Sequence, residues 1–330
     1  MKEVVVDHSC SGQKIEKFVR KFLSEAPLGY IYKAFRKKDI KINGHWVRKD
    51  AVVKEGDVVR IYVTDQQLED FHKPRPVSAK PLPYRIVYED ENVLIVDKPK
   101  GVLVYGDKTG SRETLGNAVL DYLYMKGEYD PTNASFVPSP AHRLDRNTSG
   151  LICYGKTDAG LKALTDLFKE RKQIEKYYLT LVRGNLEKDE GKIDIPLGKD
   201  PQNGRAFPQS IENGGKTAIT EYRVKERYGD FTLVEAKLCT GRTHQLRVHF
   251  ACIGHPIIGD DKYGDFKLNK VIELKTGLDS QFLHAYKLVF GNLCGALAKL
   301  SGKTFTSPLP DSYQQVIEIT CSNRHNTAVQ

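Results

Sequence analysis

The first helix of the chain can be read from the spacing of its apolar residues. Residues 11–23 carry apolar side chains at Ile15, Phe18, Val19 and Phe22. This i, i+3, i+4, i+7 spacing gathers the apolar side chains on one face of a helix. We therefore expect an amphipathic helix that packs against a small core.

A second helix and three short strands are expected next. Residues 31–35 fit a short helix, and IKINGHWV places two β-like runs on either side of Asn43-Gly44. Asn-Gly between two such runs is typical of a two-residue hairpin turn. After a turn at residues 55–57, VVRIYV predicts a third strand. Residues 1–64 are therefore expected to form a compact α/β domain.

The pattern stops at residues 65–83, which contain four prolines and no apolar period, so we expect a Pro-rich linker. Alternating runs typical of strands then follow, such as TAITEYRVKERY and FTLVEAKL, with helical stretches between them. We expect residues 84–322 to form a mixed α+β domain with a mainly antiparallel sheet. Residues 323–330 are expected to be a flexible tail.

The strand-like run KYYLTLVRG contains two adjacent tyrosines. Because side chains alternate between the faces of a strand, Tyr178, Thr180 and Val182 share one face. Tyr177 lies on the other face, which is the more apolar of the two. We therefore expect Tyr178 to face a cleft and Tyr177 to belong to the core.

The charge of the chain is positive and unevenly spread. The formal net charge is +9, and residues 31–49 alone contain seven Lys and Arg against one Asp. Such a surplus favours a polyanionic partner, although a merely basic solvated surface has the same composition.

The cysteines and the N-terminus suggest a compartment. Six cysteines are scattered along the chain with no C-x-x-C pair, which argues against a disulfide framework and a zinc finger. The N-terminal residues lack the apolar run of a signal peptide, and no stretch approaches the ~18 apolar residues of a membrane span. We expect a cytoplasmic protein without a membrane partner.

One segment can be interpreted as a phosphate-binding loop. Gly150 to Thr157 read GLICYGKT, which fits the pattern G-x-x-x-x-G-K-[ST]. The pattern needs a strand before the first glycine and a small, flexible loop after it. Here the apolar, strand-like residues occupy the loop itself, so we expect a strand and no nucleotide hydrolysis.

The sequence does not favour a metal site. His244 and His249 are five residues apart, about 140° around a helix, unlike the i, i+4 pair of a zinc helix. Asp260 and Asp261 lie in a Gly-rich segment, where a turn is the simpler interpretation.

Asp145 is the strongest candidate for chemistry. It lies in the polar segment HRLDRNTSG, which leads directly into the buried run LICY. Loops held by a buried strand often carry reactive side chains. The structural alternative is that Asp145 caps a turn and pairs with Arg143 or Arg146.

Arg247 is the candidate partner of this carboxylate. It lies in a predicted helix with an apolar stripe that starts at Leu246, a cap at Thr243 and an end at Gly254. Arg247 falls about 100° from that stripe, at its border, where it could reach a carboxylate. The alternative is an ordinary solvated arginine.

Four motifs together resemble the RluA-type RNA pseudouridine synthases: HRLDRNTSGL, DKPKG, EKYYLTLVRG and GRTHQLRVHFACIGHPIIGDDKYG. Residues 11–63 resemble the S4 RNA-binding domain, except that Lys14-Ile15-Glu16 stands where Arg-Leu-Asp is usual. The combination is most similar to the enzymes of the C and D type, which act on the large ribosomal subunit. The resemblance implies a mainly antiparallel catalytic domain after a small S4-like α/β domain.

The resemblance also implies the chemistry. Uridine in RNA becomes pseudouridine: the N1–C1′ bond breaks, the base rotates, and C5 joins C1′. Neither redox change nor hydrolysis occurs, so no cofactor and no metal are expected. Asp145 is implied as the catalytic carboxylate, which either attacks covalently or removes a ribose proton.

Further roles follow from the same resemblance. Arg247 pairs with the catalytic carboxylate, and Tyr178 stacks on the target base and assists the final deprotonation at C5. Leu246 lines the base pocket, and Arg143 enters the gap that the extracted base leaves. Lys98 and His142 complete the residues expected to bind the substrate.

RNA is the expected partner, 23S rRNA or the assembling large subunit, and the chain is expected to act as a monomer. Basic residues of the N-terminal domain are expected to contact the RNA backbone, with a solvated face as the alternative. They are Lys33, Arg36, Lys37, Lys38, Lys41, Arg48 and Lys49. A tRNA pseudouridine synthase and a non-catalytic rRNA-binding assembly factor remain alternative functions.

Overall fold

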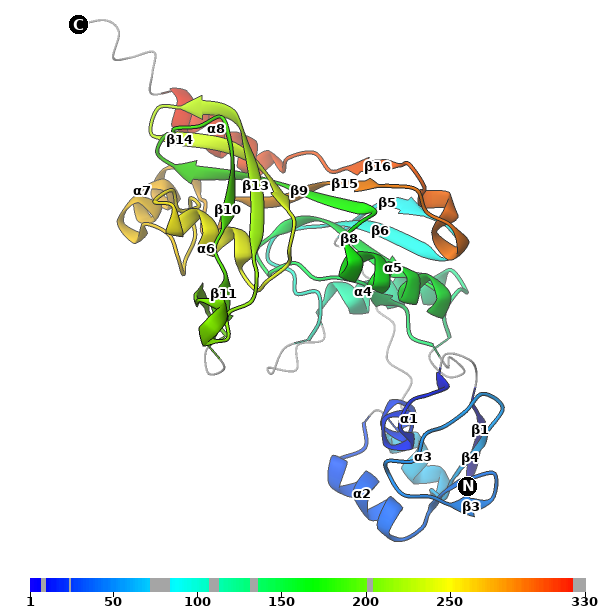
Figure 1. The fold of residues 1–330 in the computed structure, drawn as a ribbon. Helices are drawn as coiled ribbons and strands as arrows, with labels where there is room; N and C mark the ends of the chain where they lie inside the picture. Colours follow the sequence, from blue (N-terminus) through cyan, green and yellow to red (C-terminus); the bar gives the residue numbers. More distant parts are fainter. Residues whose placement is uncertain are drawn as a thin grey trace, which may run out of the picture. The chain divides into compact units, whose positions relative to one another are not determined.

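Figure 1 shows the fold of the computed structural model. It describes residues 1–6, 10–23, 25–71, 84–106, 113–130, 136–200 and 204–322. The chain divides into two compact units: residues 1–81 with 118–138, and residues 82–117 with 139–330. Helix α4 (Leu115–Met125) contains the point of division at residue 118.

In the N-terminal unit the described residues up to 71 form a four-stranded antiparallel sheet of order β1-β4-β2-β3 and three helices. Its elements are β1 (Lys2–Val5), α1 (Ile15–Phe22), α2 (Leu28–Arg36), β2 (Ile40–Ile42), β3 (His45–Trp46), β4 (Val58–Ile61) and α3 (Asp65–Phe71). The predicted helices, hairpin and strand are all present, and the strand β1 was not predicted. Asn43 and Gly44 both have positive φ, 50° and 83°, as the predicted hairpin turn requires.

The start of the predicted linker needs a correction, because its first seven residues form helix α3. The signal was present as a capping box: the Thr64 hydroxyl accepts the N–H of Gln67, and the Gln67 side chain accepts the N–H of Thr64. Leu68 and Phe71 then pack on the N-terminal core. The remaining residues of the predicted linker, 72–83, and the predicted tail, 323–330, lie outside the described residues.

The second unit is built on a large sheet of order β10-β13-β14-β9-β15-β8-β6-β5, with β16 paired to β15 and β7 to β8. Its strands are β5 (Arg85–Glu89), β6 (Val93–Lys98), β7 (Ser139–Pro140), β8 (Ser149–Gly155), β9 (Ile174–Arg183), β10 (Glu190–Asp194), β13 (Ile219–Tyr228), β14 (Phe231–Leu238), β15 (Leu283–Phe290) and β16 (Thr304–Thr306). Only the pair β8–β15 is parallel among the ladders of this sheet. The predicted α+β class with a mainly antiparallel sheet is confirmed.

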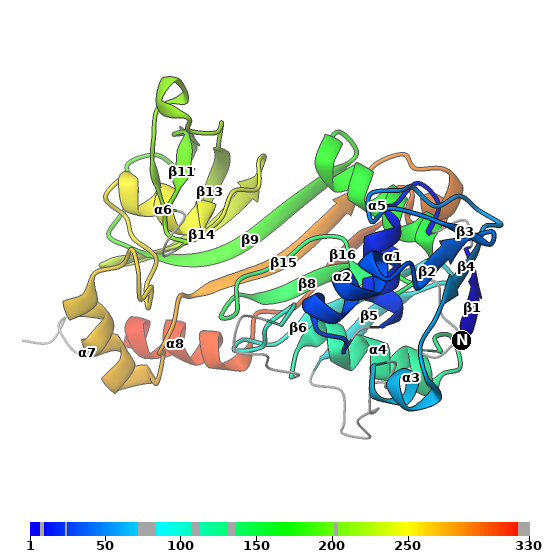
Figure 2. The ribbon, with the colours of Figure 1, turned by 90° about the horizontal axis from the view of Figure 1, so that it is seen from below.

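Helices cover both faces of this sheet, and a separate hairpin extends from it. These elements are α5 (Asp158–Glu170), α6 (Gln245–Cys252), α7 (Phe266–Thr276), α8 (Asp311–Ser322) and the hairpin of β11 (Leu197–Lys199) with β12 (Ala206–Pro208). Figure 2 shows β9 running between α5 and α6 on one side and α8 on the other. The functional consequence is that α5 and α6 leave a stretch of the same face of β9 open between them.

The two tyrosines of β9 lie as alternation predicts, but only one has the expected surroundings. Tyr178 is buried on the face that looks toward α5 and α6. Tyr177 is half-buried rather than core, and the Lys287 ammonium lies 4.1 Å from its ring centre. The reason is that α7 and α8 cover this second face at Leu181, further along the strand.

The phosphate-loop pattern falls in a buried strand. All residues from Gly150 to Gly155 belong to β8, and Lys156 donates to the Glu89 carboxylate at 2.7 Å and to the Asp90 carbonyl oxygen. Gly150 has φ +112°, and a Cβ there would meet the Ala285 backbone of the parallel neighbour. The segment is therefore a buried strand, as the sequence interpretation expected.

None of the helices in the described part of the chain combines the length and the apolar character that crossing a bilayer requires.

Candidate active site

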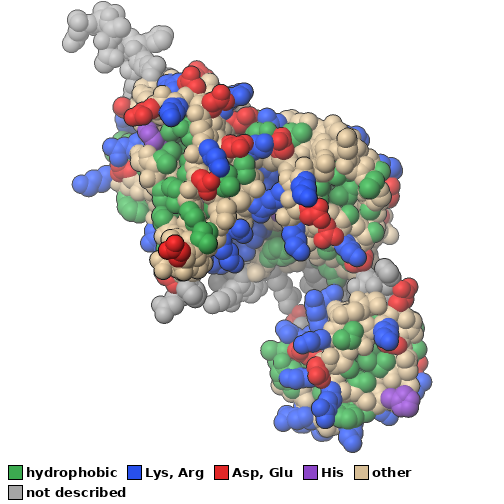
Figure 3. Space-filling model, in the orientation of Figure 1, with side chains coloured by type: hydrophobic (Ala, Val, Ile, Leu, Met, Phe, Trp, Pro, Cys, Tyr) green, Lys and Arg blue, Asp and Glu red, His purple; other side chains and the backbone are tan. Residues whose placement is uncertain are grey.

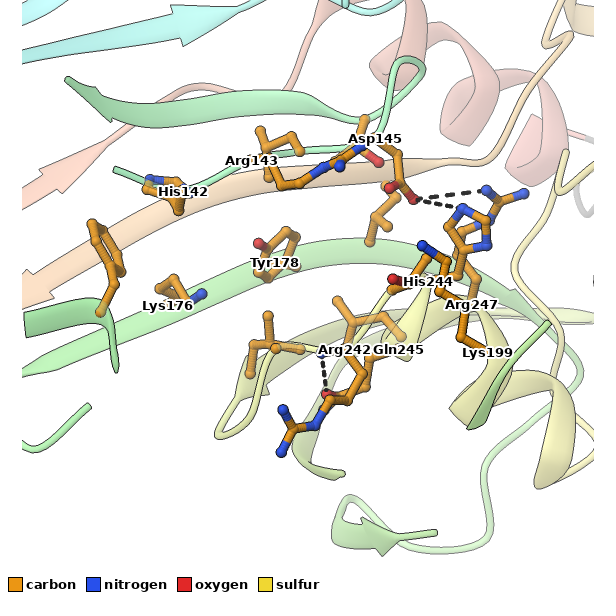
Figure 4. A pocket seen from close by; sticks show the side chains of 18 of the residues that line it. His142, Arg143, Asp145, Lys176, Tyr178, Lys199, Arg242, His244, Gln245 and Arg247 are labelled. Atoms are coloured by element: carbon orange, nitrogen blue, oxygen red, sulfur yellow. Dashed lines mark hydrogen bonds and ion pairs between the residues drawn. The ribbon is translucent and has the colours of Figure 1, made fainter. Parts of the chain in front are cut away.

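A pocket of about 550 Å³ opens on the Tyr178 face of β9. Its walls come from the loop 141–148, from α5, from β9, from Lys199 of β11 and from residues 241–247 at the start of α6. Figure 4 shows how Asp145, Tyr178, His244 and Arg247 gather around it. Residues from separate parts of the sequence thus meet where the two helices leave the strand uncovered.

Asp145 is presented to this pocket by a loop that is tied down at both ends. The loop leads into β8, whose residues are all buried. Within the loop the Asp145 carbonyl oxygen accepts the N–H of Thr148, and the Arg146 carbonyl oxygen accepts the N–H of Gly101. The Asp145 side chain remains 28% exposed, so its carboxylate can reach a ligand in the pocket.

Lys98 supports this loop from below and does not line the pocket. It is fully buried, and its ammonium donates to the carbonyl oxygens of Pro99, Val102 and Arg146 at 2.9 to 3.0 Å. Burial lowers the pKa of Lys98 to about 7, while three carbonyl acceptors match the three N–H donors of the ammonium form. Lys98, which was expected to bind the substrate, thus lies beneath the loop that carries Asp145 and outside the pocket lining.

Arg247 is buried, not solvated, and contacts three carboxylates. Two hydrogen bonds of 2.6 Å join its guanidinium to Asp260, and a third of 2.7 Å joins it to Asp261. Its Nη1 lies 3.7 Å from Oδ2 of Asp145. Burial opposes the charge, but the bonds to Asp260 and the other two carboxylates outweigh it and raise the pKa of Arg247. The site therefore holds a permanent cation beside Asp145.

Tyr178 and Leu246 line the same pocket, as expected. Both are buried, with 6% and 4% of their surfaces exposed. Burial, and then the negative charge of Asp145, raise the pKa of Tyr178. Its phenol thus stays protonated in the free enzyme at neutral pH, and the ring forms an apolar floor on which a base could stack.

Arg143 and His142 precede Asp145 on the same loop and also line the pocket. Arg143 is exposed and can move, whereas His142 is fixed. The His142 ring accepts the N–H of Cys153 at 3.1 Å and packs on Phe168 with 4.3 Å between ring centres. Burial lowers the pKa of His142 well below its ordinary value, so it presents a neutral ring.

Sequence reasoning missed several pocket residues. They are Lys169, Arg171, Lys176, Lys199, Arg242 and His244. Lys176 could have been found, because it shares the strand face of Tyr178 two residues away. Burial lowers its pKa to about 8. The others come from a helix end, a hairpin and a loop, so only the tertiary fold brings them to the pocket.

The predicted cap of α6 is also corrected. The residue before the helix is His244, not Thr243, and it has the left-handed conformation φ 52°, ψ 24°. Asp260, interpreted from the sequence as part of a turn, does form that turn by accepting the N–H groups of Lys262 and Tyr263. It is also fully buried against Arg247.

The basic residues predicted to contact RNA lie on the surface of the N-terminal unit. Of the seven, only Lys41 is half-buried, and the others are exposed. Three of the lysines lie 5.0 to 5.3 Å from the centre of an aromatic ring; the pairs are Lys38 with Trp46, Lys41 with Tyr62 and Lys49 with Tyr32. The surface therefore combines positive charge with partly exposed rings.

Within the residues that the structure describes, no group of three or more His, Cys, Asp or Glu side chains is arranged to hold a metal ion. His244 and His249 in particular point to different partners. His244 faces Asp145 and Tyr263, whereas His249 bonds to Thr220 and to the Ile195 carbonyl oxygen.

Comparison with known proteins gives the class of this enzyme. The sequence profile of the family described as RNA pseudouridylate synthase matches residues 92–252, and relatives more than 30% identical are matched over most of the chain. The chain therefore belongs to the RNA pseudouridine synthase family and is an enzyme that isomerises uridine in RNA. The resemblance drawn from the four motifs is confirmed.

The individual relatives are bacterial proteins. An RNA pseudouridine synthase of Aquifex aeolicus is 36% identical over 285 residues, 84% of this chain and 85% of that protein. The ribosomal large subunit pseudouridine synthase C of Escherichia coli K12 is 35% identical over 296 residues, 88% of each. The solved structure of human RNA pseudouridylate synthase domain containing 4 has a similar fold, with a TM-score of 0.57 and 23% identity over 71% of this chain and 92% of that one.

Proposed function

We propose that this enzyme converts uridines of large-subunit (23S) rRNA to pseudouridine, with Asp145 as the catalytic carboxylate. The main observation behind this proposal is that Asp145 lies in a pocket beside the buried cation Arg247 and the buried ring of Tyr178. The rRNA substrate is supported by the names of several relatives that are ribosomal large subunit pseudouridine synthases.

The geometry suits a reaction that passes through a charged carboxylate. Arg247 Nη1 lies toward Oδ2 of Asp145, and the described residues make no hydrogen bond to Oδ1. Oδ1 is then the oxygen free to attack C1′ or to take a ribose proton. In the covalent route Oδ1 displaces N1 from C1′, the uracil turns, and C5 then displaces Oδ1 from C1′. In the other route loss of the ribose proton expels N1, the uracil turns, and the proton returns to the ribose as C5 bonds to C1′. In both routes the proton on C5 is lost and N1 gains one through solvent or side chains.

The walls of the pocket supply the binding. The Tyr178 ring would stack on the uracil, Leu246 would pack on its edge, and Arg143 would enter the gap in the RNA. Extracting a base from folded RNA costs a few kcal/mol, which basic contacts to the phosphates offset. His142, fixed and neutral, would complete the wall next to Arg143.

We also propose that the N-terminal unit contains an S4-like RNA-binding domain, expected over residues 1–64 and extended by α3 to residue 71, and that residues 84–322 are the catalytic domain. Its seven predicted RNA-contact residues are basic and mostly exposed, which supports this assignment. We propose in addition that the enzyme acts as a monomer, since the proposed chemistry calls on no residue from a second copy of the chain. A bacterial rRNA substrate implies action in the cytoplasm.

The test is tritium release from 23S rRNA labelled at uridine C5, comparing the wild type with Asp145→Asn. We expect the wild type to release tritium and Asp145→Asn to release none above background, because an amide neither attacks C1′ nor takes the proton. Asp166→Asn, an exposed change on α5, is the matched control and should be fully active.

The same assay separates the alternatives. Release from labelled tRNA but not from 23S rRNA would assign a tRNA substrate. Absence of release from both RNAs, or equal release by wild type and Asp145→Asn, would contradict the catalytic proposal.

A further inference from the structure

His244 stands beside Asp145 in a geometry that helix formation does not explain. It occupies the residue before α6 in a left-handed conformation and makes no side-chain capping bond. Helices usually begin with Ser, Thr, Asp, Asn or Gly at this position. A left-handed backbone is uncommon for a residue with a side chain as large as that of His and costs of order 1 kcal/mol. In this conformation the imidazole ring of His244 points into the pocket (Figure 4).

The two ring nitrogens of His244 have different neighbours. Nε2 lies 3.8 Å from Oδ2 of Asp145, and Nδ1 lies 2.9 Å from the Tyr263 hydroxyl oxygen. That hydroxyl accepts the N–H of Ala206 at 2.9 Å. With that N–H accepted, the Tyr263 hydroxyl can donate its own proton to Nδ1 within the described residues. In the tautomer that this bond favours, the imidazole proton resides on Nε2, the atom that faces Asp145.

Tyr263 also contacts Arg247, the other residue that approaches Oδ2 of Asp145. Its ring centre lies 5.3 Å from the Arg247 guanidinium carbon, and its ring meets that of His244 edge-on. Tyr263 lies three residues after Asp260, which binds the Arg247 guanidinium. One turn, residues 260–263, thus fixes both groups that approach Oδ2 of Asp145.

We propose that His244 is a positioning residue for Asp145: its neutral imidazole directs the Nε2 proton to Oδ2, with the tautomer set by Tyr263. Together with Arg247 it occupies one oxygen of the carboxylate and leaves Oδ1 turned toward the substrate. Nε2 of His244 and Oδ2 of Asp145 are 3.8 Å apart in the free site. In this proposal the two atoms approach to hydrogen-bond distance when the substrate fills the pocket. This inference rests on the proposed role of Asp145 and adds to it the residue that aims the carboxylate.

The charged groups that face His244 support a neutral ring. Burial is the largest influence and lowers its pKa. Asp145 and Asp260 oppose this effect, whereas Arg247 and Lys262 reinforce it. Because the folded-state pKa lies below the ordinary value of about 6.5, the neutral form of His244 predominates at pH 6.5 and its share rises with pH.

Two substitutions separate the functions of the two nitrogens. In His244→Gln the side-chain amide nitrogen replaces Nε2 and can still donate to Asp145. In His244→Asn the amide replaces Nδ1, so contact with Tyr263 and the left-handed backbone are kept while the reach to Asp145 is lost. Both proteins should show the wild-type melting temperature within a few degrees.

The readout is single-turnover tritium release from C5-labelled 23S rRNA, with RNA affinity measured separately. We expect His244→Gln to keep the wild-type rate within about 3-fold and His244→Asn to lose about 10- to 100-fold, the worth of one hydrogen bond to a charged group. RNA affinity should be unchanged in both. Between pH 6.5 and 8 the rates of wild type and His244→Gln should follow the same curve.

The opposite results would overturn the proposal. An active His244→Asn would show that the donor to Asp145 is dispensable. Inactivity of both folded variants would show that the imidazole itself must gain and lose a proton. In either case the wild type and Asp145→Asn, measured alongside, report independently whether Asp145 is the catalytic carboxylate.

Discussion

Two buried cations, Lys98 and Arg247, prepare the carboxylate of Asp145 without being free to bind RNA themselves. The Lys98 ammonium donates its three hydrogen bonds to backbone carbonyl oxygens and so holds the loop that carries Asp145. The Nε and Nη2 atoms of Arg247 donate to Asp260 and Asp261, and its Nη1 atom is the one near Asp145. A buried charge is costly unless every donor is satisfied, and satisfied donors hold their partners in one geometry.

Replacing Lys98 by Met should separate support of the loop from binding of RNA. Three partly buried carbonyl oxygens lose this donor, which should lower the free energy of unfolding by about 3 kcal/mol. The catalytic rate at saturating RNA should fall about 10- to 100-fold, because Asp145 is no longer held in place. Urea denaturation and single-turnover tritium release measure the two effects.

The control for this change lies two residues away. Lys100 pairs with Asp279 on the surface at 2.6 Å and is 31% exposed. Lys100→Met should cost less than about 1 kcal/mol, as exposed ion pairs do, and leave the rate intact. A larger loss of RNA affinity than of rate in Lys98→Met would contradict its assignment to loop support.

At the residue scale, the sequence predicts which side chains meet in the pocket better than it predicts how deeply a side chain is buried. Asp145, Tyr178 and Arg247 were found because their residue types and motifs carry a function, and the structure brings all three to one pocket. Burial was predicted wrongly for Tyr177, and Lys98 was assigned to the substrate although it is enclosed. Which neighbours cover a side chain depends on elements distant in sequence, so periodicity alone cannot supply it.

At the scale of elements, the start of α6 and the turn at residues 259–263 act as one structural unit. The turn positions Asp260 under the helix, where its Oδ1 accepts the N–H groups of Lys262 and Tyr263. Its two oxygens also bind Arg247 on the helix. The helix itself was predicted, but its cap was not, because the left-handed residue His244 breaks the usual preference for N-caps.

Asp260→Asn should uncouple the turn from the helix. An amide leaves the buried Arg247 guanidinium without its main counter-charge, and breaking a buried ion pair on one side costs about 3 to 5 kcal/mol. We expect that loss in urea denaturation, together with a rate of tritium release at least about 10-fold lower.

Asp261 provides the matched comparison. It bonds to the same guanidinium at 2.7 Å but its side chain is 56% exposed. Asp261→Asn should therefore cost less than about 1 kcal/mol and keep most activity. Equal effects of the two substitutions would mean that burial of the Arg247–Asp260 pair is not what organises the site.

At the scale of the whole molecule, the proposed function assigns the chemistry to the larger unit and attachment to RNA to the smaller one. Figure 3 shows Lys and Arg side chains in the hollow of the larger unit and scattered over the smaller one. The sequence predicted the elements of the N-terminal residues and their basic stretch at 31–49, because charge and periodicity are local properties. It did not predict that residues 118–138 group with the N-terminal residues. It misplaced the start of the linker, since a capping box and two packed side chains extend the first unit through α3.

Salt dependence of binding should reveal whether the basic surface of the N-terminal unit contacts RNA phosphates. In a triple variant Lys33→Ala, Lys37→Ala and Lys49→Ala, three exposed cations are lost. If each neutralises one phosphate, the slope of log K against log salt should become shallower by about 2, at ~0.7 per contact for single strands. The rate at saturating RNA should not change, because none of the three lines the pocket.

A second triple variant, Lys2→Ala, Lys21→Ala and Lys54→Ala, removes the same charge from exposed positions elsewhere in the unit. Its slope should stay close to that of the wild type, because these residues do not belong to the proposed contact surface. Filter binding of 23S rRNA from 50 to 300 mM salt, about the range over which such contacts lose orders of magnitude in affinity, measures both slopes. Equal slopes for the two variants would mean that net charge, not a defined surface, attaches this unit to RNA.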